Sequence, residues 1–143
     1  MVISKTIHVQ TDPTKSQYGV CIIDITPQVK QQVAETGINN GTVTLFVAGS
    51  TAGISTIEFE SGLVSDFQSM WERITPKNIP YHHDQQWGDG NGYSHVRASL
   101  LGASLVIPLN AKKLTLGTWQ QIVLVDFDNR PRSRQIVVQI MGD

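Results

Sequence analysis

In the stretch Ile3-Ser4-Lys5-Thr6-Ile7-His8-Val9, apolar residues fall only at odd positions and every even position is polar. A period of two is typical of a β-strand with one buried face. Further short stretches rich in β-branched and apolar residues predict strands at 20–25, 43–47, 104–109, 120–125 and 135–140. Strand-forming segments therefore dominate the chain and decide its fold.

Three segments between these strands have the apolar periodicity or the end residues of helices. They are expected to begin at Thr26-Pro27, near Ser61 and at Ser94, and to end near Gly37, at Pro76 and before Gly102. The spacing of the strands favours antiparallel pairing over a doubly wound parallel sheet. We therefore expect a single α+β domain over residues 1–143, built on a β-rich antiparallel sandwich or barrel with about three helices.

The composition argues against several classes of partner. The net charge is -1 and no block of Lys and Arg occurs, so a nucleic-acid partner is not expected. No apolar run approaches the roughly 18 residues of a membrane span, and the first residues lack the apolar core of a signal peptide. The single cysteine, Cys21, cannot form an internal disulfide, which favours a cytoplasmic location.

Three of the four histidines fall in the segment Tyr81-His82-His83-Asp84-Gln85-Gln86-Trp87-Gly88-Asp89-Gly90-Asn91-Gly92-Tyr93-Ser94-His95. Imidazole binds divalent metals and exchanges protons near neutral pH, and the glycines allow the segment to close around an ion or a small substrate. With Ser94 as N-cap, His95 would lie in the first turn of a helix, where the positive helix end favours its neutral, metal-binding form. The alternative is a solvated polar loop without function.

A second polar segment is the turn Gly49-Ser50-Thr51-Ala52-Gly53. Its small residues, hydroxyl groups and backbone amides suit phosphate oxygens, although it lacks the Gly-Lys-Ser/Thr ending of a Walker loop. Glu58 follows this turn after the apolar Ile57. It is either a solvated outward residue or a base or metal ligand at the edge of a site.

Two further segments near the C-terminus admit a structural and a functional interpretation. Trp119 beside Gln120 either packs at the edge of the core or offers a flat platform for a heteroaromatic ring. After Asp126-Phe127-Asp128, arginines occupy alternate positions, at Arg130, Arg132 and Arg134. They form either a solvated hairpin with ion pairs or a clamp for phosphate, because guanidinium groups bind oxyanions bidentately.

Taken together, these segments resemble the YjbQ family, described as secondary thiamine-phosphate synthases. The resemblance is carried by Ser50-Thr51-Ala52-Gly53 through Glu58, by Tyr81-His82-His83 with Asn91 and Ser94-His95, by Gly117-Thr118-Trp119-Gln120, and by Asp126-Phe127-Asp128 with the arginines after it. It spans nearly the whole chain. It implies a compact β-rich α+β fold, a homotrimer with sites near subunit interfaces, and a bound divalent metal. The implied reaction joins a pyrimidine pyrophosphate to a thiazole phosphate and releases pyrophosphate.

On this basis we expect His83, His95 and Asp89 to bind a divalent cation, either Zn²⁺ or Mg²⁺. His82 and Glu58 are the catalytic candidates, each of which is also an alternative ligand. The residues expected to hold a small phosphorylated metabolite are Ser50, Thr51, Asn91, Trp119, Gln120, Arg130, Arg132 and Arg134.

One position departs from the family pattern. The resemblance implies a histidine just before the Ser/Thr-Thr-Ala turn, where this chain has Gly49, so His82 or Glu58 would have to substitute for it. Two other functions remain open at this point. One is a metal-dependent hydrolase of a small phosphorylated metabolite, in which the metal activates a bound water. The other is a non-catalytic trimer that binds a metabolite or an anion.

Overall fold

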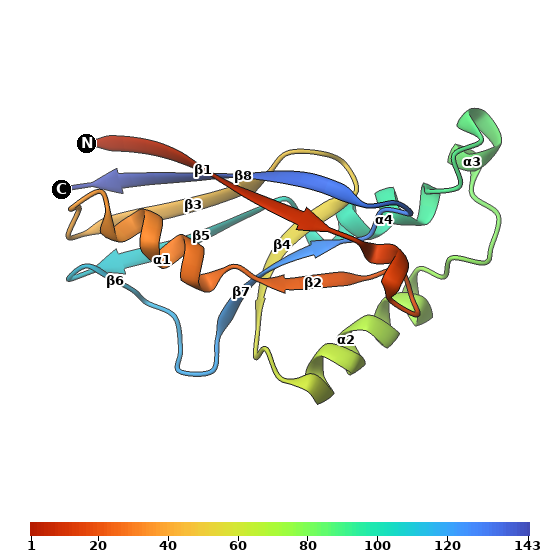
Figure 1. Cartoon of the computed structure of the whole chain (residues 1–143), viewed down its shortest axis with the longest axis horizontal. Helices are drawn as coiled ribbons and strands as arrows, with labels where there is room; N and C mark the ends of the chain where they lie inside the picture. The colour runs from red at the N-terminus through yellow and green to blue at the C-terminus, as the bar shows by residue number, and fades with distance from the viewer.

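The computed structural model describes residues 1–143 and contains two antiparallel sheets (Figure 1). The larger sheet has the strand order β1-β8-β3-β5-β6, with β1 at Val2–Thr11, β8 at Arg132–Gly142, β3 at Gly41–Val47, β5 at Ser104–Asn110 and β6 at Lys113–Leu114. The smaller sheet has the order β2-β7-β4, with β2 at Cys21–Asp24, β7 at Gln121–Asp126 and β4 at Ala52–Ile57. The expected α+β class with antiparallel sheets is therefore confirmed.

The main hydrophobic core joins the inner face of the larger sheet to the smaller sheet and to helix α1 (Thr26–Ala34). Alternation along β8 places Ile136, Val138 and Ile140 in this core, while the residues between them face solvent. The opening stretch of the sequence behaves as expected, because Ile7 and Val9 of β1 are buried and His8 is exposed.

A second, smaller core lies on the other face of β7. Ile122 and Leu124 of that strand belong to the main core, whereas Val123 and Val125 pack into the second one. Helix α2 (Ser61–Ile74), seen beside β2 and β7 in Figure 1, contributes Trp71 to this core, and helix α4 (Gly92–Leu101) contributes Ala98. Strand β7 is therefore buried on both faces. This packing fixes the position of its carboxyl end.

Four α-helices are present where about three were expected, together with a short 3-10 turn (η1, Pro13–Lys15). The additional helix, α3 (His82–Trp87), lies within the segment expected to be a pliable loop. Two expected caps are wrong. Thr26 does not cap α1, because its hydroxyl accepts a hydrogen bond from the Ile122 amide instead. Helix α4 begins at Gly92, with Asn91 rather than Ser94 at the N-cap.

None of the helices has both the length and the apolar character required to cross a membrane. The two chain ends lie side by side, and the Met1 amino group donates to the Gly142 carbonyl at 3.0 Å (Figure 1).

Candidate metal and oxyanion site

A polar cavity of about 570 Å³ lies where α3 and α4 meet the connection between β3 and β4 and the start of β8. We call it the histidine cavity. It is lined by Gly49, Ser50, Thr51, His83, Trp87, Asp89, Asn91, His95, Arg132 and Arg134. Trp87 is its single apolar lining side chain, so the cavity suits a charged or strongly polar ligand.

One wall of the cavity carries a compact set of metal-ligating groups. Nδ1 of His83 lies 3.5 Å from Oδ1 of Asp89 and 3.7 Å from Oδ1 of Asp84. Ligand atoms bound tetrahedrally at about 2.1 Å are separated by roughly 3.4 Å, so these spacings fit donors around one cation. Nδ1 of His83 is buried and has no hydrogen-bond partner within the chain, which leaves it free for a ligand.

His95 approaches the same wall from α4. Its ring centroid lies 4.4 Å from that of His83. Burial, and then the neighbouring His83 ring, lower the pKa of His95 below its ordinary value. The neutral form expected for His95 is therefore favoured, but burial is the first cause and not the position near a helix end. The donor atoms that lie within 4.8 Å of one another belong to His83, Asp84 and Asp89, and those of His95 are not among them.

The floor of the cavity is a buried ionic network. Arg134 donates through Nε to Asp126 at 2.6 Å and through Nη2 to the same carboxylate at 2.9 Å. Nη2 also donates to the hydroxyl of Thr51 at 2.6 Å. Arg132 donates through Nε to Asp128 at 2.6 Å. Both aspartates are fully buried, and Arg134 is 6% exposed.

The local sequence explains how two aspartates come to be buried here. Phe127, between them, packs into the second core, with its ring centroid 4.8 Å from that of Trp71. Because side chains alternate along extended backbone, Asp126 and Asp128 are directed away from that core and toward the arginines. The interpretation of this segment as a solvated hairpin is wrong for these two residues.

Asp128 is held ionised by its surroundings. Burial alone would raise the pKa of Asp128, but hydrogen bonds outweigh it and lower the pKa below its ordinary value. The donors are the amide of Asn129 and the side chains of Asn91, Arg132 and Thr51. Asn91 uses its Nδ2 in this bond at 3.2 Å, while its Oδ1 is buried without a partner. An orphan acceptor in the wall of a cavity points to a ligand that donates a hydrogen bond.

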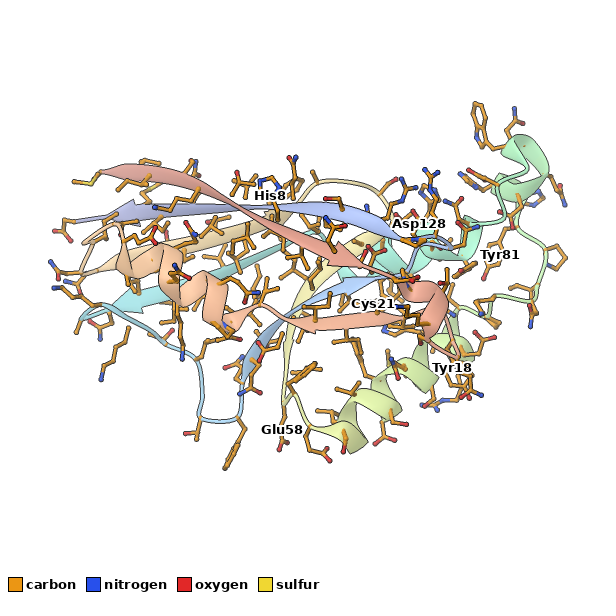
Figure 2. The ribbon with its side chains drawn as sticks, in the orientation of Figure 1. His8, Tyr18, Cys21, Glu58, Tyr81 and Asp128 are labelled. Carbon is orange, nitrogen blue, oxygen red and sulfur yellow. The ribbon has the colours of Figure 1, made fainter.

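Several residues expected at the site lie elsewhere. His82 is exposed at the start of α3 and does not line the cavity, and the exposed Arg130 does not line it either. Glu58 and Trp119 belong to a second depression of about 400 Å³, which we call the Trp119 depression; Gln120, next to Trp119, donates to Thr56 at 2.9 Å. Figure 2 shows Glu58 far from Asp128 and Tyr81, at the other end of the smaller sheet.

The register of the smaller sheet gives the reason for this separation. Ala52 pairs with Asp126 at one end of the β4–β7 ladder, and Ile57 pairs with Gln121 at the other. Extended chain rises about 3.3 Å per residue, so the five steps from Ala52 to Ile57 span roughly 17 Å, and Glu58 follows Ile57 at the end away from the cavity. Trp119 and Gln120 precede Gln121 and stay at that distant end. Within one subunit, therefore, the prediction that these residues share a site with the histidines is wrong.

Conversely, sequence reasoning did not assign four residues that contribute to the site. Trp87 lines the cavity, Asp84 stands beside His83, and Asp126 and Asp128 form the floor. The acidic pair was visible in the sequence, but its burial depends on Phe127 packing into the second core.

Comparisons with known proteins agree with the fold. The family model described as "UPF0047 protein YjbQ-like" matches residues 6–143. This chain belongs to that family. A UPF0047 protein of Methanothermobacter thermautotrophicus is 38% identical over 136 residues, which cover 95% of this chain and 93% of that protein. The UPF0047 protein YugU of Bacillus subtilis is 32% identical over 123 residues, covering 85% and 89%.

Solved structures of family members have the same architecture. The crystal structure of a YbjQ-like protein of unknown function from Sulfolobus solfataricus matches with a TM-score of 0.91 at 37% identity, covering 100% of this chain and 99% of that one. A YjbQ/UPF0047 protein from Clostridium acetobutylicum matches with a TM-score of 0.80 at 33% identity, covering 94% and 99%. The suspected family membership is confirmed, and with it the arrangement of the two sheets.

Proposed function

We propose that this chain is a metal-dependent enzyme that acts on a small phosphorylated metabolite in the histidine cavity. One observation carries the proposal: metal-ligating groups and two arginines, the buried Arg134 and the half-buried Arg132, line the same cavity. His83, Asp89 and Asp84 would hold the cation, and His95, whose ring lies beside that of His83, would be a further ligand. Imidazole donors favour Zn²⁺ or a neighbouring first-row metal, whereas a diphosphate substrate would favour Mg²⁺.

The reaction we propose is the one that the family resemblance implies, in which a pyrimidine pyrophosphate and a thiazole phosphate combine and pyrophosphate leaves. Arg132 and Arg134 would bind phosphate oxygens through the nitrogens they do not use for Asp128 and Asp126. Trp87, 71% exposed and at the cavity wall, replaces Trp119 as the platform for a heteroaromatic ring. A bound divalent cation would stabilise the charge that develops on the departing pyrophosphate.

A second candidate, hydrolysis of a phosphorylated metabolite, is favoured by the polarity of the cavity. With only one apolar lining side chain, the cavity does not exclude water from a reacting phosphate. The two reactions are separated by incubating the protein with a panel of phosphate esters and pyrophosphates. Release of phosphate without an acceptor favours the hydrolase, whereas release of pyrophosphate that requires the thiazole phosphate, together with formation of thiamine phosphate, favours the synthase.

We also propose that the chain assembles as a homotrimer in the cytoplasm. An apolar strip on the outer face of the larger sheet supports assembly, because Phe46 and Val137 are cross-strand neighbours, Val106 lies on the next strand, and all three are exposed. An assembly that brought the Trp119 depression of one copy against the histidine cavity of the next would reunite Glu58 and Trp119 with the site. Light scattering coupled to size-exclusion chromatography tests the state of assembly.

The decisive experiment for the proposed function is metal binding. The double variant His83→Ala/His95→Ala is compared with His82→Ala, which changes an adjacent histidine that does not line the cavity. We expect stoichiometric Zn²⁺ or Mg²⁺ in the wild type and in His82→Ala, and loss of both metal and activity in the double variant. Stoichiometric metal in the double variant would refute the ligand assignment, and unchanged thiamine phosphate formation would refute the catalytic one.

A further inference from the structure

The connection between β3 and β4 leaves a row of backbone donors unused. The N–H groups of Gly49, Ser50 and Thr51 take part in none of the hydrogen bonds within the chain, although Thr51 is only 4% exposed. All three residues line the histidine cavity. Successive unpaired amides in a turn form a concave binding site for anions.

A fourth donor faces the same turn. Arg134 uses Nε and Nη2 for Asp126 and Thr51, but Nη1 donates to no group in the chain. A Cβ atom on residue 49 would lie 2.6 Å from Nη1, so this nitrogen occupies the space that a side chain at position 49 would need. Three hydrogen bonds fix the guanidinium, and therefore Nη1 is held in place before any ligand arrives.

Gly49 is required here for two reasons. Its φ of +110° lies in a region that side-chain-bearing residues rarely adopt, and Nη1 of Arg134 fills the space beside it. The absence of a side chain at Gly49 is thus what lets Arg134 reach the turn. We infer that Gly49 is a specificity-determining residue, which opens an oxyanion subsite formed by Nη1 of Arg134 and the amides of residues 49–51.

The surroundings define the class of ligand for this subsite, and this step rests on the proposed function. Arg134 and Arg132 are each paired with a buried aspartate, so the subsite attracts an anion through directed N–H groups more than through net charge. Asn91, which shares the Asp128 carboxylate with Thr51, has an orphan Oδ1 that requires a hydrogen-bond donor. The ligand is therefore a phosphate monoester or pyrophosphate whose organic part carries an O–H or N–H group.

The test uses Gly49→Ala, with Gly37→Ala as its matched control. Gly37 also has a positive φ, of +72°, but no atom lies within 4 Å of the position its Cβ would take. The control therefore also places a side chain at a positive φ, but without a contact to Arg134. Calorimetric titration with inorganic pyrophosphate measures the dissociation constant for each purified protein, and circular dichroism checks that each is folded.

We expect Gly49→Ala to weaken pyrophosphate binding by about tenfold to a hundredfold, as for the loss of a charge-assisted hydrogen bond, and Gly37→Ala to change it by less than about twofold. The inference is overturned if Gly49→Ala binds as the wild type does, if both variants lose binding equally, or if the wild type binds no pyrophosphate. Metal analysis of the same samples keeps the two proposals apart. A wild type without metal that still binds pyrophosphate in a Gly49-dependent manner would refute the proposed function and retain the subsite.

Discussion

The histidine cavity and the Trp119 depression lie at opposite ends of the β4–β7 ladder, although the sequence led us to expect residues of both at one site. Both combine carboxylates, amides and a tryptophan. They differ in burial. The cavity rests on two fully buried aspartates and a nearly buried arginine, whereas Glu58 is exposed in the depression and Trp119 is 72% exposed.

The difference shows where binding energy is available in this fold. Buried charges must be oriented by partners, because an unpaired charge in the interior is costly, and such groups are therefore fixed before a ligand arrives. In the cavity the fixed groups leave particular atoms unused, namely Nδ1 of His83 and Oδ1 of Asn91. In the depression, Glu60 is occupied in capping α2 through the amides of Gly62 and Leu63.

The largest expected effect concerns the buried network. Asp126→Asn removes the charge that pairs with Arg134 and leaves the guanidinium nearly buried and poorly compensated. We expect the free energy of unfolding to fall by about 3–5 kcal/mol. Glu58→Gln, in the depression, is expected to change it by less than about 0.5 kcal/mol. Urea denaturation followed by circular dichroism measures both, and equal losses in the two variants would contradict the distinction between the two regions.

A second effect separates the regions by cation affinity. His83→Ala removes the imidazole whose Nδ1 lies 3.5 Å from Asp89. We expect the affinity for Zn²⁺ to fall by about tenfold to a hundredfold. Glu58→Ala is expected to leave this affinity unchanged, because Glu58 lies at the other end of the ladder. Competition with a chromophoric chelator gives both dissociation constants. Loss of affinity in Glu58→Ala would indicate that the glutamate of another copy reaches the cation.

The sequence predicts the sheets well because their periodicity is local. Every stretch predicted as a strand is one, and β8 alternates buried and exposed residues along nearly its whole length. The helix ends are less predictable, since they depend on long-range partners. Thr26 caps nothing because its hydroxyl is taken by the Ile122 amide, 96 positions away in the sequence.

The candidate site likewise has a part that the sequence predicts, from residues close together in the chain, and a part that depends on long-range contacts. The histidines and Asp89 are close in sequence, and the structure brings His83, Asp89 and His95 to one wall. Glu58 does not join them, because strand β4 separates it from the cavity. The strand-like residues Ile54–Ile57 could have indicated this separation. The role of Gly49 could not be predicted, because it depends on where the side chain of Arg134, 85 positions later, is held.

A third prediction concerns acid stability. The pKa of Asp128 is below its ordinary value in the folded chain, so its ionised form stabilises the fold above the unfolded-state pKa of about 4. That contribution is lost as the pH falls from about 4 through the lowered pKa. We expect the free energy of unfolding of the wild type to decline below pH 4 more steeply than that of Asp128→Asn, which lacks the group. Urea denaturation between pH 3 and pH 7 tests this, and identical slopes would contradict it.

The smallest effect compares two tryptophans that are matched in exposure, Trp87 at 71% and Trp119 at 72%. Neither contributes much to the core, so each substitution by alanine should change stability by less than about 0.5 kcal/mol. Only Trp87 lines the histidine cavity. We therefore expect Trp87→Ala to weaken the binding of thiamine phosphate by about two- to tenfold, as for the loss of one aromatic contact, and Trp119→Ala to leave it unchanged.

Fluorescence titration of the two variants distinguishes a cavity that is complete within one subunit from one shared between copies. If Trp119→Ala alone weakened binding, the ring platform would come from a neighbouring copy, because β4 and β7 hold Trp119 at the far end of its own subunit. If both variants weakened binding, the ligand would contact two copies at once. Trp119 would then lie far from the cavity of its own subunit because it serves the cavity of a neighbouring copy. The exposed strip at Phe46, Val106 and Val137 would be the first surface to mutate.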